Sequence, residues 1–299
     1  FFPRAKQGLA LGLQAGIGNF GVSMVQLLTP WIVGFMLLGG AFTAIIGDPQ
    51  QLTDAGTGAT RDVWFQNAGY AWSSLTVVGA VLAWLLLRSV PVRVARVSEQ
   101  FDIFRNKHTW IMTLLYVVTF GAFSGFAAVF ALLIKTRYGT EVFGDEGVNP
   151  ARYAFLGALV GSGARVVFGP IADRLGGAPV TVFSTVGIAV ACAHTSAQLS
   201  PDQAADFPRF LWGMLAIFLF AGIGNASTFK QMPGIFERRQ AGGVIGFTSA
   251  VAAFGPFVFS VVLASIAPAL LFWTWVIIAL AGAVLAWWYY ARPGAEKPS

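Results

Sequence analysis

Long apolar runs separated by short polar segments dominate the pattern of this chain of 299 residues. A helix needs about 20 apolar residues to cross a hydrocarbon core of roughly 30 Å. By that measure the sequence predicts eight membrane spans, which cover residues 8–37, 63–87, 109–134, 151–172, 178–198, 208–229, 242–266 and 269–291. The helical pattern of the first run can be followed as far as Ile46. We therefore expect an all-α fold, a polytopic transmembrane helical bundle.

Charged residues in the connecting segments alternate in sign and indicate how the spans are oriented. The loop after the first run is net acidic, whereas five basic residues lie in the segment 88–108, namely Arg88, Arg93, Arg96, Arg105 and Lys107. Because Lys and Arg favour the cytoplasmic side, both ends of the chain are predicted to be cytoplasmic. The net charge of +6 is then an orientation signal, and we expect no nucleic-acid partner.

Composition narrows the class of protein further. Hydrophobic residues make up 56% of the chain and charged residues 11%, which suits a protein whose main surroundings are the lipid bilayer. The single cysteine, Cys192, and two distant histidines, His108 and His194, provide neither a metal cluster nor a catalytic pair. The sequence also lacks a G-x-x-x-x-G-K-[ST] phosphate-binding loop. We expect no cofactor, no metal and no enzymatic activity, and ATP-driven transport by this chain is excluded.

One buried charge points to a substrate. Arg165 is the only charged residue in the run from Tyr153 to Ala172, and the thirteen Asp and Glu residues fall in predicted loops or at the edges of spans. A charge at bilayer depth is costly unless something pairs with it, so the missing counter-ion is predicted to be an anionic cargo. The alternative is that Arg165 extends its side chain to the headgroups. A guanidinium fork suits planar oxyanions, which include nitrate, nitrite, bicarbonate and formate.

A glycine-rich turn follows this span. The sequence G-x-x-x-D-R-x-G-G comprises Gly169, Asp173, Arg174, Gly176 and Gly177. It resembles the cytoplasmic motif of the major facilitator superfamily at its second-half position, although a simple helix-terminating turn would use similar residues. The resemblance implies helices five to twelve of a twelve-helix carrier, and hence a fragment of a longer protein. The implied division is 1–87 as the last two helices of the first bundle, 88–108 as a cytoplasmic linker, and 109–299 as the second six-helix bundle with a short tail.

A second motif narrows the resemblance. The sequence Ala-Gly-Ile-Gly-Asn occurs at 15–19 and again at 221–225, and the segment 246–257 carries a weaker, related pattern. The first of these is similar to the glycine-rich signature of the nitrate/nitrite porter family within that superfamily. The resemblance implies secondary active transport of nitrate and nitrite ions across a bacterial inner membrane by a carrier that functions as a monomer at full length.

The family resemblance also implies a substrate site. Its residues come from four spans and are Arg165, Tyr116, Phe120, Asn19, Gly16, Gly18 and Ser249. Arg165 would clamp the anion, Tyr116 would donate a hydrogen bond, and Phe120 would form an aromatic wall. Counting about 1.5 Å per residue places Asn19, Tyr116, Phe120 and Arg165 in one layer near the midplane. The competing interpretation is helix packing. We favour packing over direct ligation for the glycines, and we expect Asn225 to be a packing or gating residue.

Energy coupling can be inferred from the same charge pattern. No Asp or Glu lies inside the predicted spans, so Arg165 is the evident charge that must be compensated when the carrier reorients. An anion-loaded carrier should switch and an empty one should not, which favours exchange of nitrate against nitrite. Proton-coupled symport through Tyr116 or a carboxylate elsewhere, and transport of another small anion, remain the alternatives. A channel is disfavoured because the two-bundle pattern suits rocking alternation.

Overall fold

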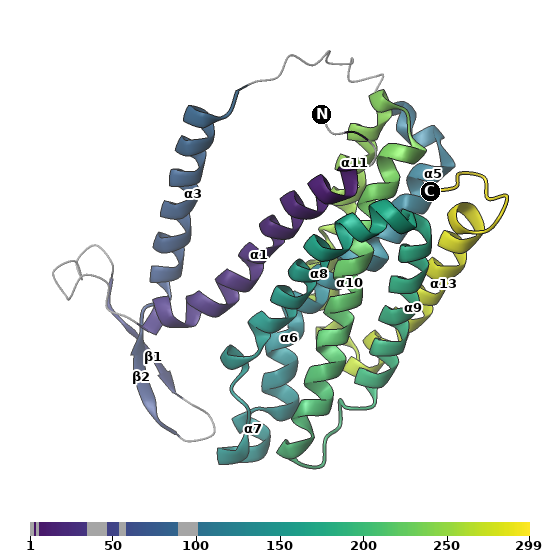
Figure 1. Cartoon of the computed structure of the whole chain (residues 1–299). Coiled ribbons are helices and arrows are strands. Elements are labelled where there is room, and N and C mark those ends of the chain that lie inside the picture. The colour runs from purple at the N-terminus through teal and green to yellow at the C-terminus, as the bar shows by residue number, and fades with distance from the viewer. Residues whose placement is uncertain (1–2, 4–5, 35–46, 54–57, 89–100) are drawn as a thin grey trace.

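The computed structural model describes residues 3, 6–34, 47–53, 58–88 and 101–299, which form a bundle of long helices (Figure 1). The principal helices are α1 (Gln7–Gly34), α3 (Gln66–Leu86), α5 (Lys107–Tyr116), α6 (Ala122–Tyr138), α8 (Ala154–Leu175), α9 (Gly177–Ser196), α10 (Phe207–Ile235), α11 (Arg238–Ala252), α12 (Gly255–Ser265) and α13 (Pro268–Ala286). The predicted continuation of the first run to Ile46 and most of the 88–108 linker lie outside the described residues.

Among the described residues, eight helical segments are long and apolar enough to cross a membrane, which confirms the predicted number of spans. Several helices continue past the predicted ends: α8 extends to Leu175 instead of residue 172, and α10 extends to Ile235 instead of residue 229. A hydropathy criterion stops at the first charged residues, here Asp173 and Lys230. The helices continue because these charged side chains find partners at the helix ends.

Two predicted spans are not single continuous α-helices. The span 242–266 is broken at Ala253 and Phe254, between α11 and α12, and Pro256 lies in the first turn of α12. Proline is tolerated there because its missing N–H would have no intrahelical partner at that position. The span that begins at Lys107 contains a π-helical segment, Val117–Gly121, between α5 and α6. Such segments are rare and frequently lie at functional sites.

The all-α prediction omitted a small hairpin. Strands β1 (Gln50–Thr53) and β2 (Thr60–Val63) pair antiparallel with Gln50 opposite Val63, and they lie between α1 and α3 (Figure 1). The N–H of Trp64 donates to the carbonyl oxygen of Val33 at 2.8 Å, which ties the hairpin to the end of α1. These short, mostly exposed strands lack a buried apolar face, so the hydrophobic pattern gave no signal for them.

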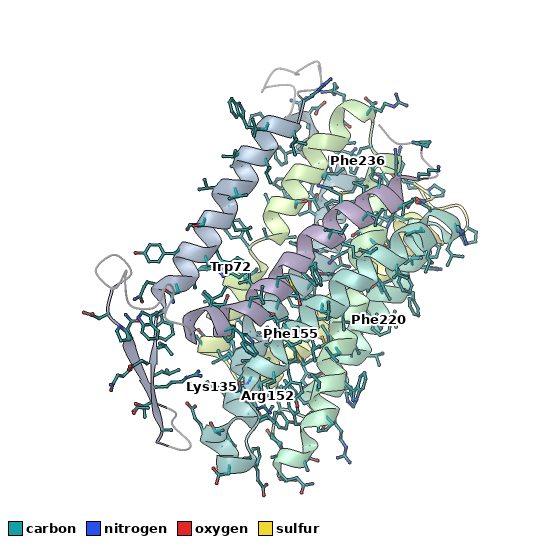
Figure 2. All side chains as sticks on the ribbon, turned by 60° about the vertical axis from the view of Figure 1, so that its left-hand side comes forward. Trp72, Lys135, Arg152, Phe155, Phe220 and Phe236 are labelled. Carbon is teal, nitrogen blue, oxygen red and sulfur yellow. The ribbon has the colours of Figure 1, made fainter. Side chains whose placement is uncertain are left out.

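Helix α3 stands apart from the main bundle and touches α1 at one end (Figure 1). There the indole N–H of Trp72 donates to the Thr29 hydroxyl at 3.0 Å, at the place where Figure 2 labels Trp72. Asn67 also donates to the carbonyl oxygen of Ile32 at 3.3 Å. The rest of α3 is exposed and apolar, and Trp84 has 81% of its surface accessible. This helix therefore presents its side chains to lipid or to other protein segments.

The core lies among α6, α9, α10, α12 and α13 and is rich in aromatic side chains. Phe126 of α6 packs edge-on against Phe259 of α12, with ring centroids 4.8 Å apart. Phe259 in turn packs against Trp275 of α13 at 4.7 Å. Such pairs add a stabilising term of about 0.5–1.5 kcal/mol beyond the area they bury. The helices of this aromatic core pack against α8 and the π-helical segment and support both.

Helix α1 crosses α8 at very close range, because glycines line the crossing. Gly8, Gly12 and Gly16 recur every four residues and form one face of α1. A Cβ on Gly12 would lie 3.0 Å from the backbone oxygen of Arg165, and one on Gly16 would lie 3.2 Å from that of Ser162. The backbone of α1 therefore supports the part of α8 that carries Arg165.

Candidate functional site

Arg165 lies in the middle of α8 with 1% of its surface exposed. Its Nη1 donates to the Tyr116 hydroxyl at 3.4 Å, and its guanidinium carbon lies 4.8 Å from the ring centroid of Phe229. None of the ion pairs in the described part of the chain involves Arg165. A buried guanidinium is therefore held by a phenol and an aromatic face, and none of the described carboxylates forms an ion pair with it.

The other two nitrogen atoms of the Arg165 guanidinium are the donors that could bind a ligand. Nε and Nη2 are buried and have no hydrogen-bond partner among the described residues. These two nitrogens lie on the same edge of the planar guanidinium, where their N–H groups are roughly parallel and fit two oxygens of one oxyanion. Unpaired buried polar groups are unfavourable, so this edge is well suited to take a planar anion.

Tyr116 and Phe120 form a wall beside the guanidinium. Their rings are stacked with centroids 5.2 Å apart and an interplanar angle of 1°, and Phe123 continues the stack at 6.0 Å from Phe120. The prediction that Tyr116 and Phe120 share one helix face is confirmed, although Phe120 lies within the π-helical segment that begins directly after Tyr116. The Tyr116 oxygen accepts from Arg165, which leaves the phenolic O–H free to donate to a second acceptor.

Asn19 is connected to this wall through a small pocket. The pocket has a volume of about 220 Å³ and is lined by residues that include Asn19, Phe120, Phe123 and Pro256. Asn19 is half-buried on α1, and its Nδ2 has no hydrogen-bond partner within the described ranges. The structure thus brings four of the predicted site residues together: Arg165 contacts Tyr116, Tyr116 stacks on Phe120, and Phe120 shares a pocket with Asn19.

Three other predicted site residues do not join this cluster in the described part of the structure. Gly16 faces α8, where a Cβ would lie 2.6 Å from Cγ2 of Val166, so its visible role is packing. Gly18 points away from α8, and a Cβ there would meet no described atom within 4 Å. Ser249 is half-buried on α11, whereas the adjacent Thr248 is fully buried and shares a hydrogen bond of 3.1 Å with Thr113.

The glycine-rich turn after α8 holds α1 as well as reversing the chain. The two carboxylate oxygens of Asp173 accept from the N–H groups of Gly8 and Leu9, each at 2.9 Å. These groups belong to the first turn of α1, where a negative charge is favoured by the helix dipole. Lys230 of α10 lies 3.7 Å from the same carboxylate. Asp173 is thereby engaged by residues of α1 and α10 at the end of α8.

The glycines of the same motif have distinct structural roles. Gly176 adopts φ +90° at the end of α8, a conformation that L side chains rarely adopt, and Gly177 starts α9. A Cβ on Gly177 would lie 2.4 Å from Cγ of Gln231, and one on Gly169 would lie 2.5 Å from the backbone oxygen of Gly8. The predicted tight reversal is confirmed. Arg174 is exposed at the end of α8.

Two residues near Arg165 were not predicted as parts of the site. Phe229 of α10 lies over the guanidinium and has its ring centroid 4.7 Å from that of Tyr116. It is one of 27 phenylalanines, so its type alone carried no signal. Asn225 lies one helical turn before Phe229 on α10, and the sequence predicts a packing or gating role for it. Its place in the second Ala-Gly-Ile-Gly-Asn sequence was the available signal.

No family model matches the chain, but several known proteins are similar to it in sequence. The probable nitrate/nitrite antiporter NarK2 of Thermus thermophilus is 55% identical over 303 aligned residues, which cover all of this chain and 66% of that relative. The nitrate/nitrite transporter NarU of Escherichia coli is 33% identical over 278 residues, covering 86% of this chain and 57% of that relative. This chain belongs to the nitrate/nitrite porter family.

Within the nitrate/nitrite porter family, similarity extends to a more distant relative. The nitrite extrusion protein of Bacillus subtilis is 25% identical over 297 residues, which cover 97% of this chain and 65% of that protein. The chain thus spans between 57% and 66% of the length of these curated relatives. Together with the eight apolar helices, the family membership establishes a multi-pass membrane protein with the major facilitator fold. The relatives are named as transporters, antiporters or extrusion proteins and not as enzymes.

Proposed function

We propose that the protein carries nitrate and nitrite across a bacterial inner membrane by alternating access, exchanging one anion for the other. The observation that carries this proposal is the buried Nε and Nη2 edge of Arg165, which has no partner among the described residues. A planar anion with two oxygens on that edge would satisfy both donors and neutralise the buried charge. The names of the relatives, which include a probable nitrate/nitrite antiporter, support the same substrates.

The residues around Arg165 would define how the anion is held. Tyr116 would add a donor through its free O–H, and the stacked rings of Tyr116 and Phe120 would exclude water from one side of the anion. Asn19, with its unpaired Nδ2, would approach from α1 through the shared pocket. Gly16 and Gly18, which have no side chains, would narrow α1 along the path of the anion. Ser249 would reach that path from α11 only after a movement of that helix. These assignments rest on the contacts and the family resemblance.

Asp173 is the carboxylate nearest to Arg165 along α8, and its pairing with other groups favours exchange over symport. Asp173 caps α1 and lies 3.7 Å from Lys230, so it is already engaged. Without an anion, the carrier would have to reorient with Arg165 as an uncompensated charge near the midplane, which is costly at bilayer depth. With an anion bound, that penalty is removed. Proton-coupled symport is the second candidate, and the Tyr116 hydroxyl beside Arg165 is the observation that favours it.

The proposal extends to orientation and organisation. The first turn of α1 contacts Asp173, and the N–H of Ala178 donates to the carbonyl oxygen of Ser299 at 2.9 Å. Both ends of the chain therefore meet the α8–α9 turn, and we place them together on the cytoplasmic side. We retain the division into 1–87, 88–108 and 109–299, with the middle segment as the cytoplasmic linker. We also retain a monomer embedded in the lipid bilayer as the functional unit at full length.

Counterflow in proteoliposomes tests the proposed exchange. The full-length natural protein is reconstituted in vesicles loaded with nitrite or, as a control, with an equal concentration of chloride, and entry of labelled nitrate is followed. We expect nitrite inside the vesicles to accelerate nitrate entry several-fold, because the loaded carrier returns faster than the empty one. Accumulation of nitrate driven by a pH gradient alone, in nitrite-free vesicles, would instead establish proton symport.

A further inference from the structure

A second buried polar side chain near Arg165 lacks partners. Asn225 of α10 is fully buried, and both its Nδ2 and its Oδ1 have no hydrogen-bond partner in the described ranges. Other buried polar residues of α10 are satisfied: Ser227 shares a 2.7 Å hydrogen bond with Thr181, and Thr228 donates to the carbonyl oxygen of Gly224 at 2.7 Å. Most buried polar atoms in proteins are paired, so an amide with both atoms unpaired requires an explanation.

The spacing of residues on α10 shows which way Asn225 faces. Phe218, Asn225 and Phe229 are separated by seven and four residues and therefore lie along one face of the helix. The ring of Phe218 packs against Phe123 with centroids 6.0 Å apart. The ring of Phe229 packs against Tyr116 and over the guanidinium of Arg165. Asn225 lies between these two aromatic contacts, on the face of α10 that looks toward the aromatic wall and α8.

The packing of α10 on α8 determines the position of Asn225 along the bundle axis. Helices α8 and α10 run parallel, since Gly161 meets Gly222 and, further along, the backbone oxygen of Ala172 accepts from Lys230 at 3.1 Å. Asn225 is three residues beyond Gly222, and Arg165 is four residues beyond Gly161. The amide therefore lies within about one helical turn of the guanidinium along the bundle axis, where a turn rises about 5.4 Å.

A third unpaired group lies in the same layer. Ser162 has 2% of its surface exposed, and its Oγ has no partner among the described residues. It precedes Arg165 by three residues and so lies one turn away on α8. Unpaired polar groups of α8 and α10 thus lie within about one helical turn of each other along the bundle axis. A cluster of this kind costs stability unless a polar ligand satisfies it.

We propose that Asn225 is a further anion-contacting residue, whose Nδ2 donates to the oxyanion held on the Nε and Nη2 edge of Arg165. This inference rests on the proposed function and deepens it. A neutral amide adds a hydrogen bond to the anion without adding a charge that would have to be compensated when the carrier is empty. It would also engage an oxygen of nitrate beyond the two that the guanidinium edge can take.

The test separates anion contact from packing by measuring affinity and stability together. Asn225→Leu keeps the number and the branching of the side-chain heavy atoms and removes both polar atoms. Removing an unsatisfied buried amide should leave the melting temperature of the full-length protein unchanged or raised. We expect nitrate affinity, measured by titration of the purified protein, to fall about tenfold or more, because a hydrogen bond to a charged group is lost. A role in packing alone would leave the affinity unchanged.

The matched control is Thr185→Val on α9. Thr185 is equally buried, and its hydroxyl donates only within its own helix, to the carbonyl oxygens of Thr181 at 2.9 Å and Val182 at 3.0 Å. This variant should bind nitrate with wild-type affinity. If Asn225→Leu does not fold, Asn225→Asp decides, because it keeps the shape of the side chain but presents acceptors to the anion and should lose binding to the same extent or more.

The outcomes distinguish this inference from the function on which it rests. Wild-type nitrate affinity in Asn225→Leu, or in Asn225→Asp where the first variant does not fold, would overturn the role of Asn225 while the proposed function stands. Failure of the wild-type protein itself to bind nitrate or nitrite would overturn the proposed function and this inference together. Selective loss of affinity in the Asn225 variants, with Thr185→Val unaffected, would support the inference.

Discussion

At the scale of single residues, the proposed anion binding depends on how Arg165 is held. One of its nitrogens is engaged by Tyr116 and its face is covered by Phe229, so the guanidinium is fixed while one edge stays unpaired. A fixed fork is useful for a planar anion because little side-chain freedom is lost when the anion binds. Lysine carries the same charge but cannot donate two parallel hydrogen bonds from one plane.

Arg165→Lys should therefore keep the fold and lose most anion binding. We expect nitrate affinity of the full-length protein to fall at least tenfold, since one of two charge-assisted hydrogen bonds, worth about 1.5–3 kcal/mol, is lost. Titration with nitrate checks this result. Arg174→Lys is the matched control, because Arg174 is exposed at the end of the same helix and should tolerate the change. Near-normal affinity in Arg165→Lys would remove Arg165 from the site.

Only some residues of the candidate site could be predicted from the sequence. Arg165 was identifiable because a lone charge in an apolar run is conspicuous, and the four-residue spacing of Tyr116 and Phe120 indicated a shared face. Phe229 and Asn225 were not identifiable as site residues. Their proximity to Arg165 depends on how α10 packs along α8, and that register is set by glycine contacts between distant parts of the chain.

At the scale of helices, the α1–α8 crossing connects the α8–α9 turn to the candidate site. Glycines bring the two backbones together, and the Asp173 carboxylate caps the first turn of α1. Hydrophobic periodicity predicted the existence of both helices but not their close contact. It also missed the break between α11 and α12, although Pro256 was a visible signal, because both flanking segments are apolar enough to read as one span.

Gly169→Ala tests the importance of this crossing. Its new Cβ would lie 2.5 Å from the backbone oxygen of Gly8, so the helices would have to separate. We expect a loss of about 1–3 kcal/mol in stability from this overpacking. Gly163→Ala, on the same helix, is the control, since a Cβ there meets no described atom within 4 Å and alanine favours helix. Thermal unfolding of both variants measures the effect, and equal melting temperatures would contradict it.

The contact between the linker and α11 should depend on pH. Asp102, in the short helix Phe101–Arg105, accepts from Arg239 and, at 3.1 Å, from Gln240. The hydrogen bond from Arg239, followed by that from Gln240, lowers the pKa of the Asp102 carboxyl from its ordinary value. A lowered folded-state pKa means that the stabilisation is present above the unfolded-state pKa and is lost as the pH falls through the folded-state value.

The variant Asp102→Asn measures this contribution. The difference in melting temperature between wild type and Asp102→Asn should stay constant from about pH 5 to 8 and shrink below about pH 4, where the carboxyl takes up its proton. Thermal unfolding across this pH range provides the measurement. A difference that grows on acidification would show that the carboxylate does not contribute in its charged form.

At the scale of the whole molecule, apolar length predicted the eight spans that are found among the described residues, because the bilayer imposes a minimum helix length. The major facilitator fold was expected from the resemblance of two motifs. Apolar length could not predict the β1–β2 hairpin, whose short, mostly exposed strands leave no hydrophobic signature. The site arises where α8, α10, the π-helical segment and α1 meet. It is therefore a property of the assembled bundle, to which each span contributes one or two side chains.

The central claim is that Arg165 holds the transported anion on its Nε and Nη2 edge. The most direct measurement is an experimental structure of the full-length protein with nitrate bound. We predict the anion in the plane of the guanidinium, with oxygens about 2.7–2.9 Å from Nε and Nη2, beside the Tyr116 hydroxyl. Nitrate bound elsewhere in the protein, with this edge of Arg165 paired to a carboxylate, would contradict the account.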